Sequence, residues 1–478
     1  MEQKSLREEG FFLSVGIPLV KKLTLSALVI VVIVGLPLWY YFGQNQNPND
    51  PNNQTELTDT LIEGINLVQG DFHIDLVASG LVNGYARQKT QIYSGVYDPT
   101  SNTTFVVFSG GVNDSYSACS PYIISYNHET LEWSEPVEIM ASPVEPDSHN
   151  YPQLVIDPNG YLHVFHSFHG NHPVVHAKSL SPRSTNGWAF TTLPDSDLAT
   201  YGAAFIDSTG DFYFIARAWE KYDPPLEPEY LWKSEDNGNT WTRRKLINPV
   251  PNNDYWGTIY TKSVHYQKTN GREGLHITFG LHKNHNEFHD GHYYVYLSFQ
   301  DDLLYHANGT LLGQEVNRTQ FEKELTLFRY NRDVPFFNTR MATTETSSGE
   351  LVVFYNWELD NGTDVLAESR FQDGEWKSKV HPELTDVSPW EIFEDNDGKL
   401  NVLAKKWGRR VFCYRFNGSN FENESLILYA DNDLSYGFSN IHFIDDPRDV
   451  IRGTVILGDD ANWRAPSPTG YLIYFELS

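Results

Sequence analysis

Four polar side chains of this sequence are suited to joint acid–base chemistry: His149, His169, Tyr201 and Arg217. Elimination from a uronic acid needs a cation at the sugar carboxylate, a base that removes the C5 proton and an acid that protonates the leaving oxygen. Arg217 is the candidate cation. His149 and Tyr201 are the candidate acid/base pair, and His169 is a candidate for orienting or polarising the substrate. Each also has a structural reading, because strand histidines and tyrosines are often packed and hydrogen-bonded.

Predicted hairpins explain how these side chains can meet. The first histidine lies eight residues before Asp157 of one turn, and the second lies nine residues after Gly160 of the same turn. In the next hairpin the tyrosine lies six residues before Asp207, and the arginine seven residues after Gly210. Antiparallel pairing brings the two ends of a hairpin together, away from its turn. We therefore expect all four side chains on one rim, beside a central channel if the hairpins belong to consecutive blades.

One hairpin pattern recurs seven times along the body of the chain: an apolar strand, a turn of Asp, Asn, Ser or Gly, and a second apolar strand. The turns lie near Asp98, Asp157, Asp207, Gly271, Gly349, Asp395 and Asp446. The repetition predicts an all-β fold, a seven-bladed β-propeller; a β-sandwich with many hairpins is the alternative. The C-terminal strand TGYLIYFELS is expected to pair with a strand near residues 72–76 and close the ring.

Residues 234–241 (SEDNGNTW) fit the S-x-D-x-G-x-T-W box of sialidase-like propellers. We expect Asp236 to brace the turn and Trp241 to pack between sheets. The box is a folding element and carries no catalysis.

A family resemblance rests on Ser148–Pro152 (SHNYP), the following VIDPNGYLHVF, and Phe168–Asn171 (FHGN). These segments resemble the BNR-repeat family of seven-bladed propellers that includes the ulvan lyases. The resemblance implies a polysaccharide lyase in which His149 and His169 are active-site elements twenty residues apart and Asn150 contacts the substrate. It continues through a tyrosine with an arginine sixteen residues later, and it covers most of residues 90–315.

The sequence departs from this family pattern in places. Gly202 stands where the family usually has proline after its tyrosine, and a family tryptophan is replaced near Tyr305. Tyr260 is similar in spacing to a substrate-contacting tyrosine of the family. Lys405 lies seven residues after Gly398, as Arg217 does after its turn glycine. It is therefore either a second rim cation for an acidic glycan or a solvated strand end.

The net charge of −27 argues against a nucleic-acid partner, which requires a basic surface. An acidic polysaccharide, the expected partner, can bind only where a few cations are concentrated. Four histidines within residues 282–292 (HKNHNEFHDGH) have ligand-like spacing, but a solvated loop is the favoured interpretation. We expect no metal and no cofactor.

The N-terminal region predicts a membrane anchor. Residues 23–42 form an uncharged stretch long enough to cross a bilayer, and Lys21 and Lys22 before it place residues 1–22 in the cytoplasm. A cleaved signal peptide is the alternative. Residues 43–62 are expected to be an extracellular linker and residues 63–478 an extracellular propeller at the cell membrane. Eight Asn-x-Ser/Thr sequons from Asn53 to Asn423 agree with a glycoprotein of this topology.

Three functions are compatible with these observations. The first is an extracellular, lyase-like enzyme that cleaves a uronate-containing polysaccharide by β-elimination. The second is a non-catalytic carbohydrate-binding propeller at the cell surface. The third is a sialidase-like glycosidase, which needs three arginines and a Tyr–Glu pair, whereas Arg217 is the one arginine well placed on the early blades.

Overall fold

The computed structural model describes most of the compact unit Leu57–Ser478. The described residues are 57–477 without the gaps 63–64, 69–71, 80–92, 113–114, 144–150, 221–225, 250–256, 270, 283–290, 330–339, 396, 407–409, 419, 431–436, 447–450 and 459–470. No helix within these ranges is long and apolar enough to cross a membrane. The predicted anchor at residues 23–42 lies outside them.

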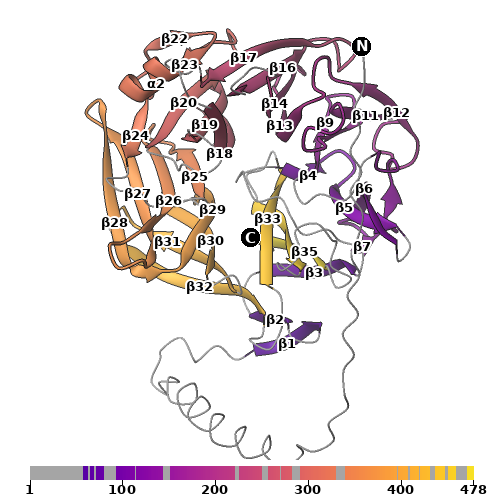
Figure 1. The fold of residues 1–478 in the computed structure, drawn as a ribbon. Helices are drawn as coiled ribbons and strands as arrows, with labels where there is room; N and C mark the ends of the chain where they lie inside the picture. The colour runs from indigo at the N-terminus through magenta and orange to yellow at the C-terminus, as the bar shows by residue number, and fades with distance from the viewer. Residues whose placement is uncertain are drawn as a thin grey trace, which may run out of the picture. The chain divides into compact units, whose positions relative to one another are not determined.

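The described strands form six hydrogen-bonded sheets, of which the nine-stranded sheet joins two antiparallel groups through the parallel pair β33–β4. Counted in this way, seven groups of mainly antiparallel strands follow one another around the unit (Figure 1). The first group contains β4 (Tyr93–Asp98), β5 (Thr103–Val112), β6 (Ser115–Asn127), β7 (Glu132–Trp133) and β8 (Val137–Glu138). The second contains β9 (Pro152–Ile156), β10 (Leu162–His166), β11 (Val175–Ser179) and β12 (Trp188–Thr192). The third contains β13 (Ala199–Ile206), β14 (Phe212–Ala218), β16 (Glu229–Ser234) and β17 (Thr242–Asn248), extended by β23 (Val316–Asn317).

The later groups repeat this hairpin order with additions. The fourth contains β18 (Gly257–Thr269), β19 (Arg272–His282), β20 (Gly291–Ser298), β21 (Leu304–Tyr305) and β22 (Leu311–Gly313), with β15 (Leu226–Glu227) and β24 (Thr326–Arg329) added; α2 (Arg318–Glu324) precedes β24. The fifth contains β25 (Met341–Glu345), β26 (Leu351–Glu358), β27 (Asp364–Gln372) and β28 (Glu375–Thr385). The sixth contains β29 (Val387–Glu394), β30 (Leu400–Lys406), β31 (Arg410–Phe416) and β32 (Phe421–Ala430). The seventh contains β33 (Gly437–Asp445), β34 (Ile451–Gly458), β35 (Tyr471–Leu477) and β3 (Phe72–Ser79).

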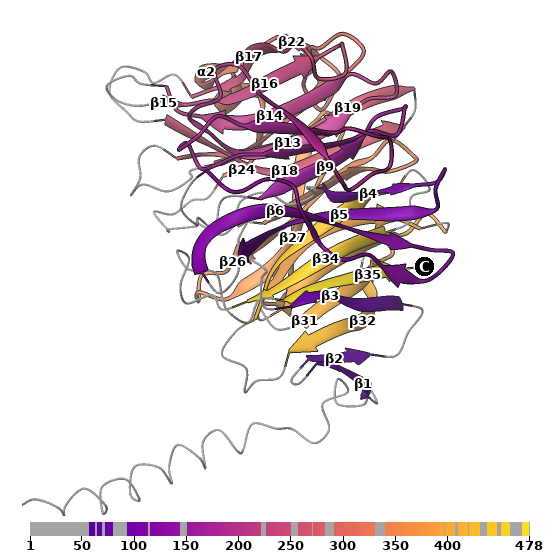
Figure 2. The same ribbon diagram turned by 90° about the vertical axis from the view of Figure 1, so that its right-hand side faces the viewer.

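Strand pairing closes the ring where the sequence predicts it. The C-terminal β35 pairs antiparallel with β3, with Phe72 opposite Leu477 and Leu76 opposite Ile473. Figure 2 shows these two strands side by side near β34. The innermost β33 also pairs with β4 of the first group. The last group thus combines strands from both ends of the unit. Because β3 pairs with the outer edge of β35, the backbone groups of that edge are not left open.

The linker predicted over residues 43–62 ends earlier than expected. Residues 57–62 form β1, which pairs with β2 (Ile65–Val68), and β2 pairs with β32 of the sixth group. The reason is that the outer edge of β32 presents backbone groups that this hairpin can pair. A strand therefore begins where an extended linker was predicted.

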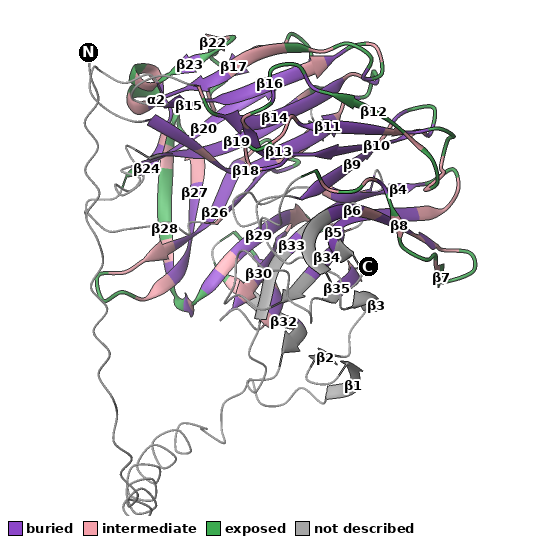
Figure 3. Cartoon of the chain, turned by 45° about the vertical axis from the view of Figure 1, so that its right-hand side comes forward, coloured by how far each residue is buried: buried purple, intermediate pink, exposed green. Residues whose placement is uncertain are grey.

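Apolar clusters join each group to the next. Pairs of cluster members from successive groups are Phe105 and Leu154, Phe165 and Phe214, Ile215 and Val264, Phe328 and Tyr355, Phe354 and Tyr414, Leu403 and Phe443, and Tyr474 and Phe108. Strands in the middle of their sheets, such as β14 and β20, are buried throughout. The outer β28 is largely exposed, as the colours of Figure 3 show. Burial between sheets around a centre is typical of a propeller-like fold.

The predicted box at residues 234–241 has its expected structure. Asp236 Oδ2 accepts a hydrogen bond from the Thr240 hydroxyl (2.6 Å), and its Oδ1 accepts one from the Thr240 backbone N–H (2.8 Å). These bonds lower the pKa of Asp236 to about 2. Trp241 packs edge-on against Phe165 of the second group, with ring centroids 5.7 Å apart. The turn is braced by its carboxylate and anchored between sheets by its indole, which confirms the prediction.

Candidate active site

Four side chains singled out in the sequence form one cluster on the second, third and fourth groups. The His169 and Tyr201 rings have centroids 6.0 Å apart. The Arg217 guanidinium lies 4.7 Å from the Tyr201 ring centroid and 4.4 Å from that of Tyr260. Tyr201 and Arg217 are 4% and 5% exposed, while His169 and Tyr260 are half-buried. The cluster is therefore a buried cation–aromatic core with a more exposed edge.

Two predicted residues, His149 and Asn150, lie outside the described residues. The chain resumes at Tyr151, whose hydroxyl donates a hydrogen bond to the carbonyl oxygen of Gly202 (3.1 Å). Burial, reinforced by nearby Tyr201, raises the pKa of Tyr151 well above its ordinary value. Tyr151 thus stays protonated and acts as a hydrogen-bond donor to the strand that carries Tyr201.

Irregular backbone directs the site side chains. In β13, Thr200 pairs with Arg217 and Ala203 with Ile215, so the intervening Tyr201 and Gly202 form a bulge. Tyr201 has φ 56° and His169 has φ 49°, in the left-handed region that costs a non-glycine residue on the order of 1–3 kcal/mol. The two segments are tied together, because the Gly170 N–H donates to the Ala199 carbonyl (3.1 Å). Such backbone strain is concentrated at functional sites.

The Arg217 side chain is held between aromatic rings and an acid. Its Nε lies 3.1 Å from Glu227 Oε2 on β15, and both side chains are buried. Burial disfavours the guanidinium, but Tyr260, Glu227 and Tyr201 raise the pKa of Arg217 above its ordinary value. Arg217 is thus a permanent cation whose charge is partly balanced by Glu227.

Two cations of the cluster were missed in the sequence, Lys262 and Arg340. The Lys262 ammonium lies 5.5 Å from the Tyr260 ring centroid, and the residue is 3% exposed. Burial, and then repulsion by Arg340 and Arg217, lowers the pKa of Lys262 to about 7. The spacing offered a partial signal, since Lys262 stands two residues after Tyr260 and residues two apart in a regular strand share a face.

Lys405 lies on β30 opposite Ser388 and is half-buried. Its ammonium lies 5.8 Å from the ring centroid of Trp390, which also receives the Arg340 guanidinium at 4.7 Å. Trp390 is itself the bulged residue of β29, between paired Pro389 and Glu391. The Lys405 ammonium therefore has an aromatic face beside it, and its role as a second rim cation stays a prediction.

The histidine-rich segment is only partly described. His285 and His289 lie outside the described residues, whereas His292 is buried in β20 with its ring stacked on Phe328 (centroids 4.8 Å apart). The solvated loop predicted there is wrong for His292, because β20 begins one residue earlier and places it in the core. Among the described residues, no group of three acidic, histidine or cysteine side chains is arranged to hold a metal ion.

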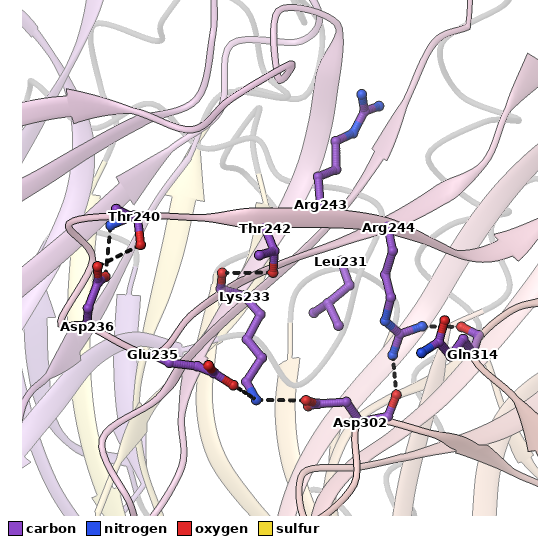
Figure 4. A pocket seen from close by; sticks show the side chains of 10 residues that line it. All are labelled: Leu231, Lys233, Glu235, Asp236, Thr240, Thr242, Arg243, Arg244, Asp302 and Gln314. Carbon is purple, nitrogen blue, oxygen red and sulfur yellow. Dashed lines mark hydrogen bonds and ion pairs between the residues drawn. The ribbon is translucent and has the colours of Figure 1, made fainter.

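A separate pocket of about 530 Å³ lies on the outer strands of the third group and the start of the fourth group's outer turn. Figure 4 shows Lys233 reaching between Glu235 and Asp302, with 2.7 Å from its nitrogen to an oxygen of each. Arg244 donates to the carbonyls of Asp302 (2.5 Å) and Gln314. Both cations have protein partners, so the pocket holds ion pairs of Lys233 and backbone hydrogen bonds of Arg244, distinct from the cluster around Arg217.

Comparison with known proteins identifies the family. Residues 117–383, more than half of the chain, match the profile of a BNR repeat-containing family member. The chain belongs to the BNR repeat-containing family. The matched range of this BNR repeat-containing protein includes every described residue of the cluster from His169 to Arg340.

Individual relatives of this BNR repeat-containing protein are ulvan lyases. The ulvan lyase of Nonlabens ulvanivorans is 30% identical over 181 residues, which are 33% of this chain and 36% of the relative. The ulvan lyase of Alteromonas sp. (strain LOR) is 28% identical over 164 residues, 29% of this chain and 31% of the relative. The chain therefore matches about a third of the length of these curated relatives.

A solved structure supports the fold. The PL25 ulvan lyase bound to -[GlcA(1-4)Rha3S]- superimposes with a TM-score of 0.64 and 18% identity, covering 83% of this chain and 95% of that chain. The same values hold for a second structure of a PL25 ulvan lyase. At this identity the likeness shows a shared propeller-like fold.

Proposed function

We propose that this protein is a polysaccharide lyase-like enzyme that cleaves a uronate-containing polysaccharide by β-elimination. The observation that carries the proposal is the buried Arg217 guanidinium between the Tyr201 and Tyr260 rings, with His169 beside them. A fixed cation next to a phenol and an imidazole has the groups that elimination from a uronate requires. The similarity to ulvan lyases in sequence supports the same reaction class.

In the proposed reaction, Arg217 binds the sugar carboxylate and stabilises the negative charge that develops there. His149 and Tyr201 form the acid/base pair: one takes the C5 proton, and the C5–H electrons form the C4–C5 double bond. The C4–O bond breaks, and the other member of the pair protonates the leaving oxygen. His169 orients the substrate, and Asn150, Tyr260 and Lys405 contact the chain.

We further propose that the unit is a seven-bladed propeller held outside the cell. The seven strand groups and the pairing of β3 with β35 support the blade number. The apolar residues 23–42 support a single membrane anchor with a cytoplasmic N-terminus, and residues 43–56 would form the linker. An acidic polysaccharide outside the cell is accessible to an enzyme in that position.

A second candidate is a non-catalytic propeller that binds the same polysaccharide. The near-complete burial of Tyr201 and Arg217 favours it, because a polymer has little surface of either residue to contact, whereas His169 and Tyr260 are more exposed. Such a protein would keep the aromatic and cationic contacts without turnover.

The test is an elimination assay with the purified chain and glucuronate-containing polysaccharides, following the ultraviolet absorbance of the unsaturated product. We expect product from the wild type and a loss of at least about 100-fold in kcat/KM for Tyr201→Phe and for Arg217→Ala. Tyr305→Phe and Arg329→Ala, on the peripheral β21 and β24, serve as matched controls with unchanged rates. Binding without product would support the second candidate, and an unaffected Tyr201→Phe would contradict the proposed role of its hydroxyl.

A further inference from the structure

We propose that Lys262 is a second cation for the substrate's carboxylate and that it takes up a proton when the anionic chain binds. The inference rests on the proposed function of the site and adds a residue and a proton to it. It starts from a charge imbalance. Glu227 already balances part of the Arg217 charge. Removal of the C5 proton adds a second negative charge to the sugar carboxylate, and Arg217 alone stabilises this dianion only in part.

The placement of Lys262 is built into its strand. In β18, Thr261 pairs with Phe279 and Ser263 with Thr278, which leaves Lys262 as the extra residue of a bulge. Bulges next to active sites re-aim side chains. The bulge places the ammonium 5.5 Å from the centroid of Tyr260, the ring that also contacts Arg217 (4.4 Å). Lys262 thus lies in the same cation–aromatic cluster.

The groups around Lys262 come from each element packed against β18. Two guanidiniums act on Lys262, that of Arg217 on β14 and that of Arg340, the residue before β25. Three buried acids lie in the same region: Glu227 on β15 pairs with Arg217, Glu229 on β16 acts on Tyr151, and Glu391 on β29 lies 3.8 Å from His265 of β18. The neighbouring β19 places His276 opposite His265. Burial lowers the pKa of His265 to about 4, so this imidazole is neutral. The two guanidiniums repel the Lys262 ammonium. Burial and this repulsion keep part of the Lys262 population uncharged until an anion binds.

Proton uptake follows from this balance. With a pKa of about 7, Lys262 is only partly protonated at neutral pH. A carboxylate entering the cluster favours the charged ammonium and raises its pKa. Binding at neutral pH should then take up a fraction of a proton, and the same proton supplies the second positive charge at the carboxylate. At neutral pH, Lys262 is therefore fully protonated only when substrate is bound.

The test is titration calorimetry of the full chain at about pH 7, with an unsulfated glucuronate oligosaccharide, in buffers of different ionisation enthalpy. The wild type should show a buffer-dependent enthalpy that corresponds to net proton uptake on binding, and this uptake should shrink as the pH is lowered below the pKa of Lys262. Lys262→Arg, with its permanent charge, should bind without this uptake. Lys262→Gln should bind at least about 10-fold more weakly. Lys178→Gln is the matched control, since Lys178 also lies over a tyrosine ring (4.8 Å from the Tyr161 centroid) but on β11.

The outcomes separate this inference from the proposed reaction. Binding with Lys262-dependent proton uptake but no unsaturated product would reject the lyase proposal and keep the inference. Cleavage by the wild type with the same uptake in Lys262→Arg would reject the inference and keep the lyase. A carboxyl-reduced oligosaccharide that still drives the uptake would also contradict it, because no carboxylate is then present. A wild type that binds no glucuronate chain would overturn both.

Discussion

At the scale of single residues, local charge outweighs the net charge of the molecule. The chain carries 62 acidic and 35 basic side chains, yet Arg217, Lys262 and Arg340 lie close enough to influence one another. Aromatic faces of Tyr201, Tyr260 and Trp390 receive all three cations and limit the cost of burying them. An acidic polymer repelled by most of the surface would thus find a positive site at this cluster.

Lys262→Met tests the residue-scale argument without any ligand. The pKa of Lys262 is about 7 in the folded protein and about 10.4 for an unperturbed lysine, so the wild type loses stability as pH falls from about 10 to about 7. Below about pH 7 the full loss of unfolding free energy is reached, and it amounts to at most about 5 kcal/mol. Denaturant unfolding should show Lys262→Met more stable than wild type at about pH 6, with the gap closing toward about pH 10. Lys178→Met should show no such pH-dependent gap, and a destabilised Lys262→Met at low pH would contradict the argument.

At the scale of elements, bulges on three inner strands decide which side chains meet. They fall at Tyr201 in β13, Lys262 in β18 and Trp390 in β29. Turn spacing alone predicted that Tyr201 and Arg217 share a strand end, and the pairing of Thr200 with Arg217 confirms it. Lys262 was missed because a bulge depends on partner strands and loops that a local sequence pattern does not encode.

Gly202→Ala tests the β13 bulge. A Cβ at this position would lie 2.6 Å from Cε2 of Phe214, a buried ring stacked on Phe165 (centroids 5.5 Å apart). Because this ring has little room to move, we expect a loss of about 1–3 kcal/mol in unfolding free energy and, if the proposed reaction holds, a loss of its rate. Phe214→Leu should restore part of both losses when combined with Gly202→Ala, as measured in a double-mutant cycle. Equal effects of Gly202→Ala in both backgrounds would show that the close approach to Phe214 does not matter.

At the scale of the whole unit, stability depends on neighbouring groups covering one another around the centre. The hairpin repeat predicted the groups and their closing strand, because turns and alternating residues are local signals. The β1–β2 hairpin was not predicted, since its pairing with β32 joins segments more than 350 residues apart. Ring closure likewise depends on pairing between β3 and β35, which lie at opposite ends of the unit's sequence.

Truncation from the N-terminus tests this closure. A chain beginning at Leu57 keeps every described strand and should unfold cooperatively. Removing residues 1–70 deletes β1 and β2 but keeps β3, so the midpoint of thermal unfolding should fall only slightly. Removing residues 1–79 also deletes β3, exposes the edge of β35 and uncovers part of the cluster of Ile473 and Phe475, which Ile74 contacts. We expect the midpoint to fall by about 10 °C or more, with concentration-dependent aggregation, because an open sheet edge recruits other chains. Equal midpoints for the two shorter chains would show that β3 does not hold the ring closed.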